Sequence, residues 1–91
     1  MNFSQRFELL LELADRLGVQ VRAEPLGGDG GGLCTLRGQQ VLFVDTQADL
    51  QSRYEKTLGA LAAFGDLDKH YVLPEIRQDL QKYRRQGGYE H

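Results

Sequence analysis

Cysteine and long apolar runs are both scarce in this sequence. Cys34 is the single cysteine, so no disulfide can form within the chain, which suits a reducing compartment. No apolar run approaches the ~20 residues that cross a bilayer, and we therefore expect no membrane association. The first residues also lack the basic segment and apolar block of a secretory signal. Together these absences predict a cytoplasmic protein.

An excess of charge of one sign is also absent. The 11 basic and 13 acidic residues give a net charge of −2, which provides no basic field for nucleic acid. The hydrophobic share of 41% and the charged share of 26% are ordinary for a soluble domain. The length leaves room for one domain. We expect residues 1–86 to form a single α+β domain and residues 87–91 a flexible C-terminal tail.

The first clear pattern in the chain is a helical period near the N-terminus. Apolar residues at this spacing predict an amphipathic helix over Ser4–Leu17; they are Phe3, Phe7, Leu10, Leu11, Ala14 and Leu17. Asn2 followed by Gln5 predicts a variant of the capping box at its start. Gly18 follows the last apolar residue and predicts a left-handed C-cap.

A glycine-rich loop separates the next two strands. From Val19 to Glu24 apolar and polar residues alternate, which predicts a half-buried strand that Pro25 ends. The loop Gly27–Gly32 follows. Such glycines can cradle a phosphate where they lead into a helix N-terminus. Here they lead into a strand, which favours a flexible connector, and binding of a small ligand by this loop stays an alternative.

A β-hairpin follows the loop. We expect strands over Leu33–Arg37 and Gln40–Asp45, joined at Gly38–Gln39 by a type II′ turn with glycine in its first central position. The segment Val41–Val44 is apolar on both faces, which predicts a central strand or one covered on both sides. We interpret Cys34 as a small residue of the core.

Two helices complete the predicted fold. A second amphipathic helix is expected over Ala48–Phe64, capped by Asp45 or Thr46 and ended by Gly65. Pro74 marks the first position of a third helix. The fold class is thus predicted to be α+β. It comprises a small three-stranded, mainly antiparallel sheet packed with three helices, in the order α-β-β-β-α-α.

This order resembles the N-terminal half of the ImmA/IrrE-type zincin-like metallopeptidases. The resemblance lies in the strand "LGVQV", the glycine-rich loop, the hairpin "GGLCTLRGQQVLFVD" and the helix after it, and covers approximately residues 9–64. In that family the helix carries "TLAHELGH" or a similar motif. Its two histidines share one helix face and bind zinc, and its glutamate activates the metal-bound water.

This chain has "TLGALAAF" at the place of that motif. Thr57 and Leu58 match its first two residues. Ala60 and Phe64 stand where the two histidines would be, and Leu61 stands where the glutamate would be. The resemblance therefore implies a metallopeptidase-like scaffold that has lost its metal site. We accordingly predict no catalytic residue, no metal and no cofactor.

Two further groups of residues are weaker candidates for chemistry. Asp66, Asp68 and His70 alternate and could offer ligands to a divalent ion, although a solvated linker is the favoured interpretation. Ser52 has no adjacent base, and His91 lies far from His70 in sequence, so a Ser-His-Asp site has no support.

The segment Lys82–Arg85 interleaves a tyrosine with basic residues, as some nucleic-acid surfaces do. Its place at a helix end has a simpler cause in the helix dipole, and we expect no nucleic-acid partner. The sequence thus predicts a non-enzymatic protein-interaction or regulatory module. A protein partner, or self-association about a two-fold axis, would cover its sheet edges. The alternatives are a metal-dependent hydrolase and a small-ligand binder.

Overall fold

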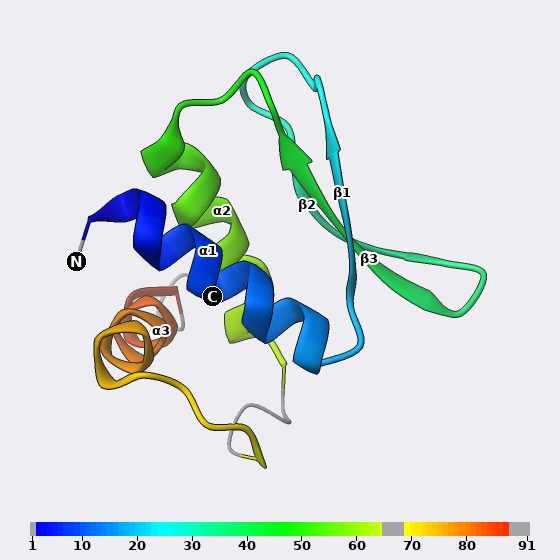
Figure 1. The fold of residues 1–91 in the computed structure, drawn as a ribbon. Helices are drawn as coiled ribbons and strands as arrows, with labels where there is room; N and C mark the ends of the chain where they lie inside the picture. The colour runs from blue at the N-terminus through cyan, green and yellow to red at the C-terminus, as the bar shows by residue number, and fades with distance from the viewer. Residues whose placement is uncertain (1, 65–68, 88–91) are drawn as a thin grey trace.

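The computed structural model describes residues 2–64 and 69–87 (Figure 1). Its elements are, in chain order, α1 (Phe3–Arg16), β1 (Gln20–Glu24), β2 (Gly32–Leu36), β3 (Gln39–Asp45), α2 (Leu50–Ala62) and α3 (Pro74–Gly87). The predicted α+β class and the order α-β-β-β-α-α are confirmed. No helix in these described ranges is long and apolar enough to cross a membrane.

The three strands form a mixed sheet in the order β1-β3-β2. β2 and β3 are antiparallel, but β1 and β3 are parallel, so the prediction of a mainly antiparallel sheet was wrong. The chain reverses direction twice between β1 and β3, and β3 then enters the sheet between the other two strands. β3 takes the centre because it is the most apolar strand, as its sequence predicted.

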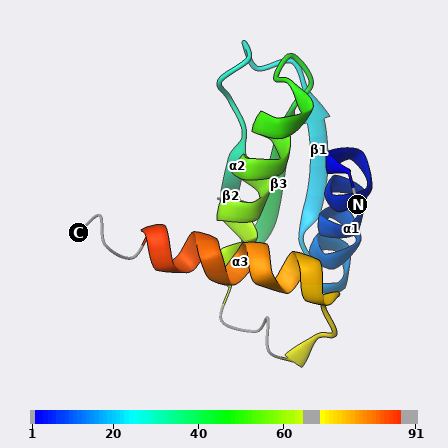
Figure 2. The ribbon, with the colours of Figure 1, turned by 90° about the vertical axis from the view of Figure 1, so that its left-hand side faces the viewer.

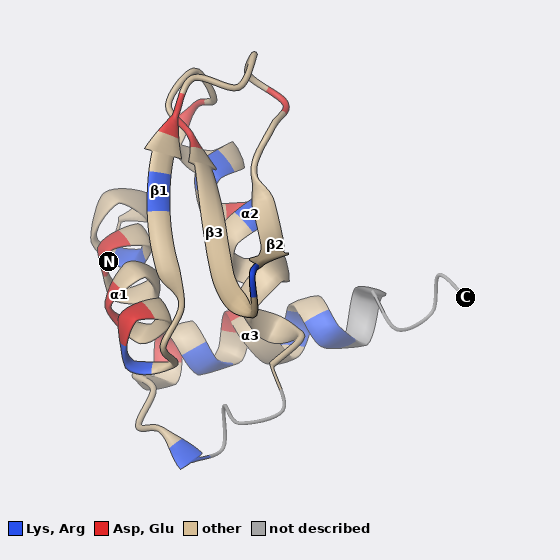
Figure 3. Ribbon diagram, turned by 90° about the vertical axis from the view of Figure 1, so that its right-hand side faces the viewer, with Lys and Arg blue, Asp and Glu red and all other residues tan. Residues whose placement is uncertain are grey.

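Helices cover one face of the sheet only. α1 and α2 lie on that face, and α3 crosses behind them on the side away from the strands (Figures 1 and 2). The core between these layers includes Leu10, Leu13, Leu42, Val44, Tyr54, Leu61, Ile76 and Leu80. Figure 3 looks onto the opposite face of the sheet, which no helix of the described chain covers.

The predicted capping box at the start of α1 is confirmed. The Asn2 side chain accepts from the backbone N–H of Gln5 at 2.8 Å, and the Gln5 side chain accepts from the backbone N–H of Asn2 at 3.2 Å. These two bonds satisfy amide donors that the first helical turn leaves without partners. At the other end Gly18 has a φ of +80°, the left-handed conformation expected after a helix.

The hairpin turn lies one residue before its predicted place. Leu36 pairs with Gln39, so the two-residue turn is Arg37–Gly38. Both have positive φ, 53° and 80°, which is the type I′ pattern rather than the predicted type II′. In this register Leu33 and its partner Leu42 both lie on the helix-covered face. Leu42 is buried in the core and Leu33 packs against it.

The alternation of side chains along β2 corrects the interpretation of Cys34. Since alternate side chains of a strand point to opposite faces, Cys34 lies opposite to Leu33, on the uncovered face. Its side chain is exposed and is not part of the core.

The second helix begins later than predicted. Its N-cap is Asp49, whose side chain accepts from the backbone N–H of Ser52 at 2.7 Å. The prediction that Asp45 or Thr46 caps α2 was wrong, because Asp45 binds the glycine-rich loop instead. Pro74 is the first residue of α3, as predicted, and α3 ends at Gly87, the first residue of the predicted tail. The rest of that tail, residues 88–91, lies outside the described ranges.

Candidate functional site

The glycine-rich loop is held by one carboxylate at the end of β3. Asp45 is only 2% exposed and accepts from four backbone N–H groups. Its Oδ1 accepts from Leu26 at 2.8 Å and Gln47 at 2.9 Å. Its Oδ2 accepts from Gly28 at 2.6 Å and Gly30 at 3.0 Å. The loop is therefore ordered around Asp45, whereas the sequence predicted a flexible connector.

This loop has the features of an anion-binding nest, and Asp45 is its anion. Gly27 and Gly28 have φ of 90° and 96°, a conformation that turns neighbouring amides toward a common point. Burial by itself would raise the pKa of Asp45, but the four amide donors hold that pKa below its ordinary value of 3.8. Because the chain's own carboxylate uses these donors, the loop offers fewer of them to a phosphate.

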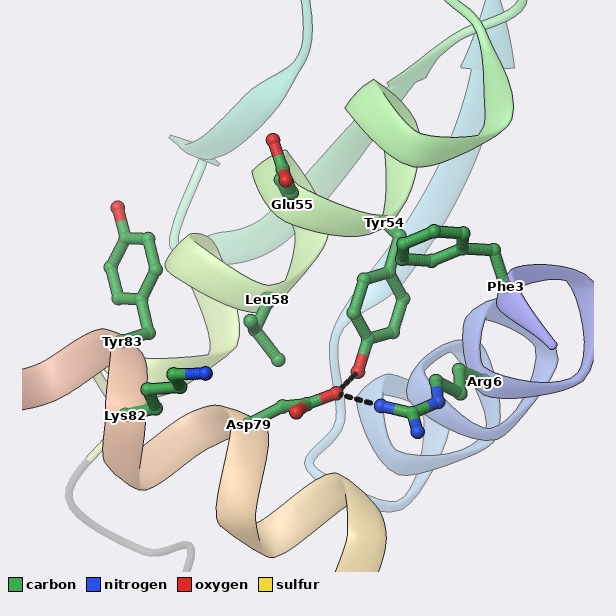
Figure 4. Close-up of a pocket in the computed structure, with 8 residues that line it drawn as sticks. All are labelled: Phe3, Arg6, Tyr54, Glu55, Leu58, Asp79, Lys82 and Tyr83. Carbon is green, nitrogen blue, oxygen red and sulfur yellow. Dashed lines mark hydrogen bonds and ion pairs between the residues drawn. The ribbon is translucent and has the colours of Figure 1, made fainter. Parts of the chain in front are cut away.

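A second polar cluster joins the three helices (Figure 4). It borders a cavity of about 500 Å³ lined by Phe3, Arg6, Tyr54, Glu55, Leu58, Asp79, Lys82 and Tyr83. Asp79 of α3 accepts from Nη1 of Arg6 in α1 at 2.6 Å, and it also accepts from the hydroxyl of Tyr54 in α2. Figure 4 shows both donor side chains pointing to the same carboxylate. The cluster therefore links α1, α2 and α3.

The pKa shifts and the balance of charges in this cluster are those expected of side chains that hold helices together. Burial raises the pKa of Tyr54, and its hydrogen bond to Asp79 raises it further. The hydrogen bond to Asp79 also raises the pKa of Arg6, against the effect of burial. The cations Arg6 and Lys82 balance the anions Glu55 and Asp79 around the cavity. Among the described lining residues there is neither a thiol nor a histidine.

The three positions of the resembled zinc motif are apolar and packed. Leu61 is buried in the core, and Ala60 and Phe64 pack against it as partly buried side chains. Ala60 also borders a shallow hollow of about 370 Å³ beside β2, with Gly32 and Tyr83 among its other lining residues. None of the three side chains carries a metal ligand or a base.

Of the remaining candidate ligands, only His70 lies in the described chain. Asp66 and Asp68 lie outside the described residues, while His70 is half-buried. In residues 2–64 and 69–84, no three His, Cys, Asp or Glu side chains are placed to hold a metal ion.

The basic segment near the end of α3 has a structural task. The Nε of Arg84 donates to the carbonyl of Ala62 at 2.8 Å, and its Nη2 donates to the carbonyl of Phe64 at 3.1 Å. These carbonyls lie at the C-terminal end of α2, where helical backbone leaves acceptors without partners. Arg84 therefore caps α2 from the neighbouring helix.

The uncovered face of the sheet carries an apolar stripe over its centre and its β2 side. Leu36, Cys34, Val41 and Phe43 form this stripe, because they alternate away from the helices. Val41 is only 3% exposed and Phe43 is half-buried, so the accessible part of the stripe lies at Cys34 and Leu36 on β2. Leu36 is 45% exposed. The guanidinium of Arg22, on β1, lies 5.6 Å from the centre of the Phe43 ring. The β1 side of the face is thus charged, whereas the β2 side is not.

The two edges of the sheet differ in the same way. On β1, Arg22 and Glu24 form an ion pair at 2.9 Å, and Pro25 follows. Charges and proline are the usual means by which an edge strand resists pairing with another chain. β2, Gly32–Leu36, contains neither. The unprotected edge of the sheet is therefore β2, a feature that the sequence alone could not show without the strand order.

Comparison with family models, with curated proteins and with solved structures finds no match to this chain. The class of protein is therefore defined by its own fold: a small α+β domain with a mixed sheet, covered by helices on one face. Within that class the particular features of this chain are its uncovered apolar stripe and its unprotected β2 edge.

Proposed function

We propose that this protein is a non-enzymatic interaction domain that docks another polypeptide along β2 and the adjoining apolar stripe. One observation carries the proposal: the uncovered stripe adjoins an edge strand without charge or proline. Addition of a strand to such an edge is a common mode of polypeptide recognition, in which the backbone supplies affinity and the side chains supply specificity.

The hairpin geometry defines which backbone groups are offered. Leu36 and Gln39 flank a type I′ turn, so they form a hydrogen-bonded pair. Hydrogen-bonded and non-hydrogen-bonded pairs alternate along an antiparallel ladder. Cys34 therefore directs its N–H and C=O to β3, whereas Leu33 and Thr35 direct theirs outward. These two residues supply the hydrogen bonds for a docked strand.

The alternatives have less support. The amides that a phosphate would need in the glycine-rich loop are bonded to Asp45. The positions that would carry a zinc site in the resembled family hold Ala60, Leu61 and Phe64, and these side chains pack in or against the core. Neither a small-ligand site nor a hydrolytic site is therefore favoured by an observation of its own.

Thr35→Pro tests the docking edge. Proline removes the outward N–H of residue 35 but no hydrogen bond to β3, so the monomer fold is expected to persist. Thr35→Val, which keeps the N–H, is the matched control. Three tagged proteins are compared: the wild type, Thr35→Val and Thr35→Pro. Each is incubated with lysate from the native source, to which untagged wild-type chain has been added. We expect bound polypeptide to fall at least about tenfold for Thr35→Pro only.

Circular dichroism of each variant verifies that the fold is kept. The proposal fails if folded Thr35→Pro captures the same polypeptides as the wild-type protein, or if Thr35→Val loses them equally.

A further inference from the structure

We infer that the polypeptide docked on β2 is a second copy of this chain, paired antiparallel about a two-fold axis through Cys34. This inference rests on the proposed docking edge and names its partner. The two copies would form one continuous sheet in the order β1-β3-β2-β2-β3-β1, and each would cover the other's unprotected edge.

The backbone of β2 suits such pairing because its outward groups are symmetric about Cys34. Leu33 and Thr35 lie one residue to either side of it. In an antiparallel pair centred on Cys34, Leu33 of one copy lies opposite Thr35 of the other. The two Leu33–Thr35 pairs formed in this way each exchange two N–H···O bonds. Between them, the Cys34 residues of the two copies lie opposite each other as a non-hydrogen-bonded pair. A two-fold interface is self-complementary in this sense.

The side chains of β2 are complementary in the same register. Leu36, 45% exposed, lies opposite Gly32 of the second copy. A Cβ added at Gly32 would meet nothing within 4 Å, so there is open space for the leucine. No residue of β2 is charged, and hence no like charges oppose each other across the strands.

Charges beyond the two ends of β2 are also complementary. Arg37 follows β2 in the hairpin turn, and Asp29 precedes it in the glycine-rich loop; both are exposed. Figure 3 shows acidic residues at the loop end of the sheet, where Lys56 also donates to the backbone carbonyl of Asp29. An antiparallel pairing brings the turn of each copy to the loop end of the other, so opposite charges approach.

The helix layer adds to the contact. Figures 2 and 3, which view the molecule from opposite sides, both show α3 continuing past the β2 edge. A copy placed along β2 would extend toward the described part of α3 that passes this edge. The paired copies would meet through sheet and helix together, which buries more surface than strand pairing alone.

Light scattering of purified protein at several concentrations tests this pairing. We expect the wild-type protein and Cys34→Ser to have twice the mass of one chain. Cys34→Lys is expected to have the mass of one chain, because it sets two ammonium groups opposite each other at the axis. Thr35→Pro provides a second monomeric variant that does not depend on residue 34. A wild-type monomer, or a dimer that persists in folded Cys34→Lys and Thr35→Pro, overturns the inference.

Cys34 itself reports on the register. In a non-hydrogen-bonded pair its two Cα atoms lie about 4.5 Å apart, within the range of about 4.4–6.8 Å that a disulfide spans. Diamide, which accepts the two thiol hydrogens, should link the wild-type copies within minutes at low protein concentration. The control is Cys34→Ser with Gln20→Cys, whose thiol lies on the same face but on β1. Equal cross-linking of the two proteins contradicts the register.

The two proposals fail in different ways. A wild-type monomer that still captures another protein through Thr35 overturns the self-pairing and supports the docking edge. A dimer unaffected by Thr35→Pro overturns the self-pairing, and it overturns both proposals if Thr35→Pro also captures the same polypeptides as the wild-type protein.

Discussion

Among single residues, Asp45 has the largest influence on local structure. It ends the central strand, and its carboxylate accepts from amides before and after it in the chain. Four donors around one buried carboxylate exceed what a helix cap or a surface turn provides. Asp45 therefore determines the path of the glycine-rich loop between β1 and β2, and with it the position where β2 starts.

Asp45→Asn is expected to lower the urea midpoint of unfolding. The amide keeps one acceptor oxygen, but its NH₂ group must face two backbone N–H donors, which leaves those donors unsatisfied. Asp49→Asn is the matched control, since asparagine caps a helix about as well as aspartate. We expect its midpoint to change little. Equal shifts in the two variants would show that the contacts of Asp45 are not special.

The pH dependence of the wild-type protein provides a second test at Asp45. Its pKa is lower in the folded chain than the ordinary 3.8, so the stabilisation is complete above that pH. It is lost as the pH falls further, through the pKa of the folded state. Thermal melts below about pH 4 should therefore show a steeper loss of stability for the wild-type protein than for Asp45→Asn. Parallel curves would contradict the assignment.

At the level of elements, the contact of α2 with α3 depends on a residue without a side chain. A Cβ added at Gly59 would lie 2.6 Å from Oη and 2.8 Å from Cζ of Tyr83. The Tyr83 ring is 43% exposed, so it can move outward at a cost in packing. Gly59 thus lowers the helix propensity of α2 but allows the ring to lie against it.

Gly59→Ala measures this balance. Alanine favours the interior of a helix by about 1 kcal/mol over glycine. In a Tyr83→Ala background, where the clash is absent, we expect Gly59→Ala to raise the free energy of unfolding by about 0.5–1 kcal/mol. In the wild-type background displacement of the ring should cancel this gain. Urea unfolding of the four proteins in this cycle gives the coupling, and equal gains in both backgrounds would rule out the contact.

For the molecule as a whole, the Arg6–Asp79–Tyr54 cluster fixes how the third helix sits on the other two. Each residue comes from a different helix, and Tyr54 is buried, with its hydroxyl bonded to Asp79. In the described chain α3 packs mainly against α2 and also contacts α1. Its position therefore depends on its apolar side chains, on this cluster and on the capping of α2 by Arg84.

Tyr54→Phe should change the stability at high pH in a defined direction. The pKa of Tyr54 is raised in the folded chain, so its stabilisation is present below the ordinary value of 10.0 and is lost as the pH rises above it. Tyr54→Phe is expected to cost about 1–2 kcal/mol near neutral pH, from the lost hydrogen bond to Asp79. It should then lose less stability than the wild-type protein between about pH 9 and about pH 11.

Thermal melts across this pH range provide the measurement. Tyr71→Phe, which changes an exposed ring, is the control and should keep the alkaline transition of the wild-type protein. A Tyr54→Phe protein with that same transition would contradict the role of the hydroxyl.

Much of the fold followed from local pattern. The period of the apolar residues predicted α1, the capping box identified its start, and Pro74 marked the start of α3. The apolar run of β3 predicted its central place. These features depend on side chains a few residues apart, and the sequence contains that information directly.

The errors arose where contacts distant in sequence compete with local rules. Asp45 is well placed to cap a helix, yet amides 15 to 19 residues earlier bind it instead. Gly38 suits the first central position of a type II′ turn, but Leu36 pairs with Gln39, so Gly38 takes the second position of a type I′ turn. Cys34 is exposed because the helices pack on the face that carries Leu33, and the position of the helices is a tertiary contact.

By itself, the sequence determined the kind and order of the elements and the absence of histidine and glutamate from the positions of the resembled zinc motif. Only the tertiary structure decided that β1 and β3 are parallel, that Asp45 organises the glycine-rich loop, and that β2 is the unprotected edge. The physical reason is that strand order and edge exposure are set by the burial of side chains far apart in the chain, which no local pattern encodes.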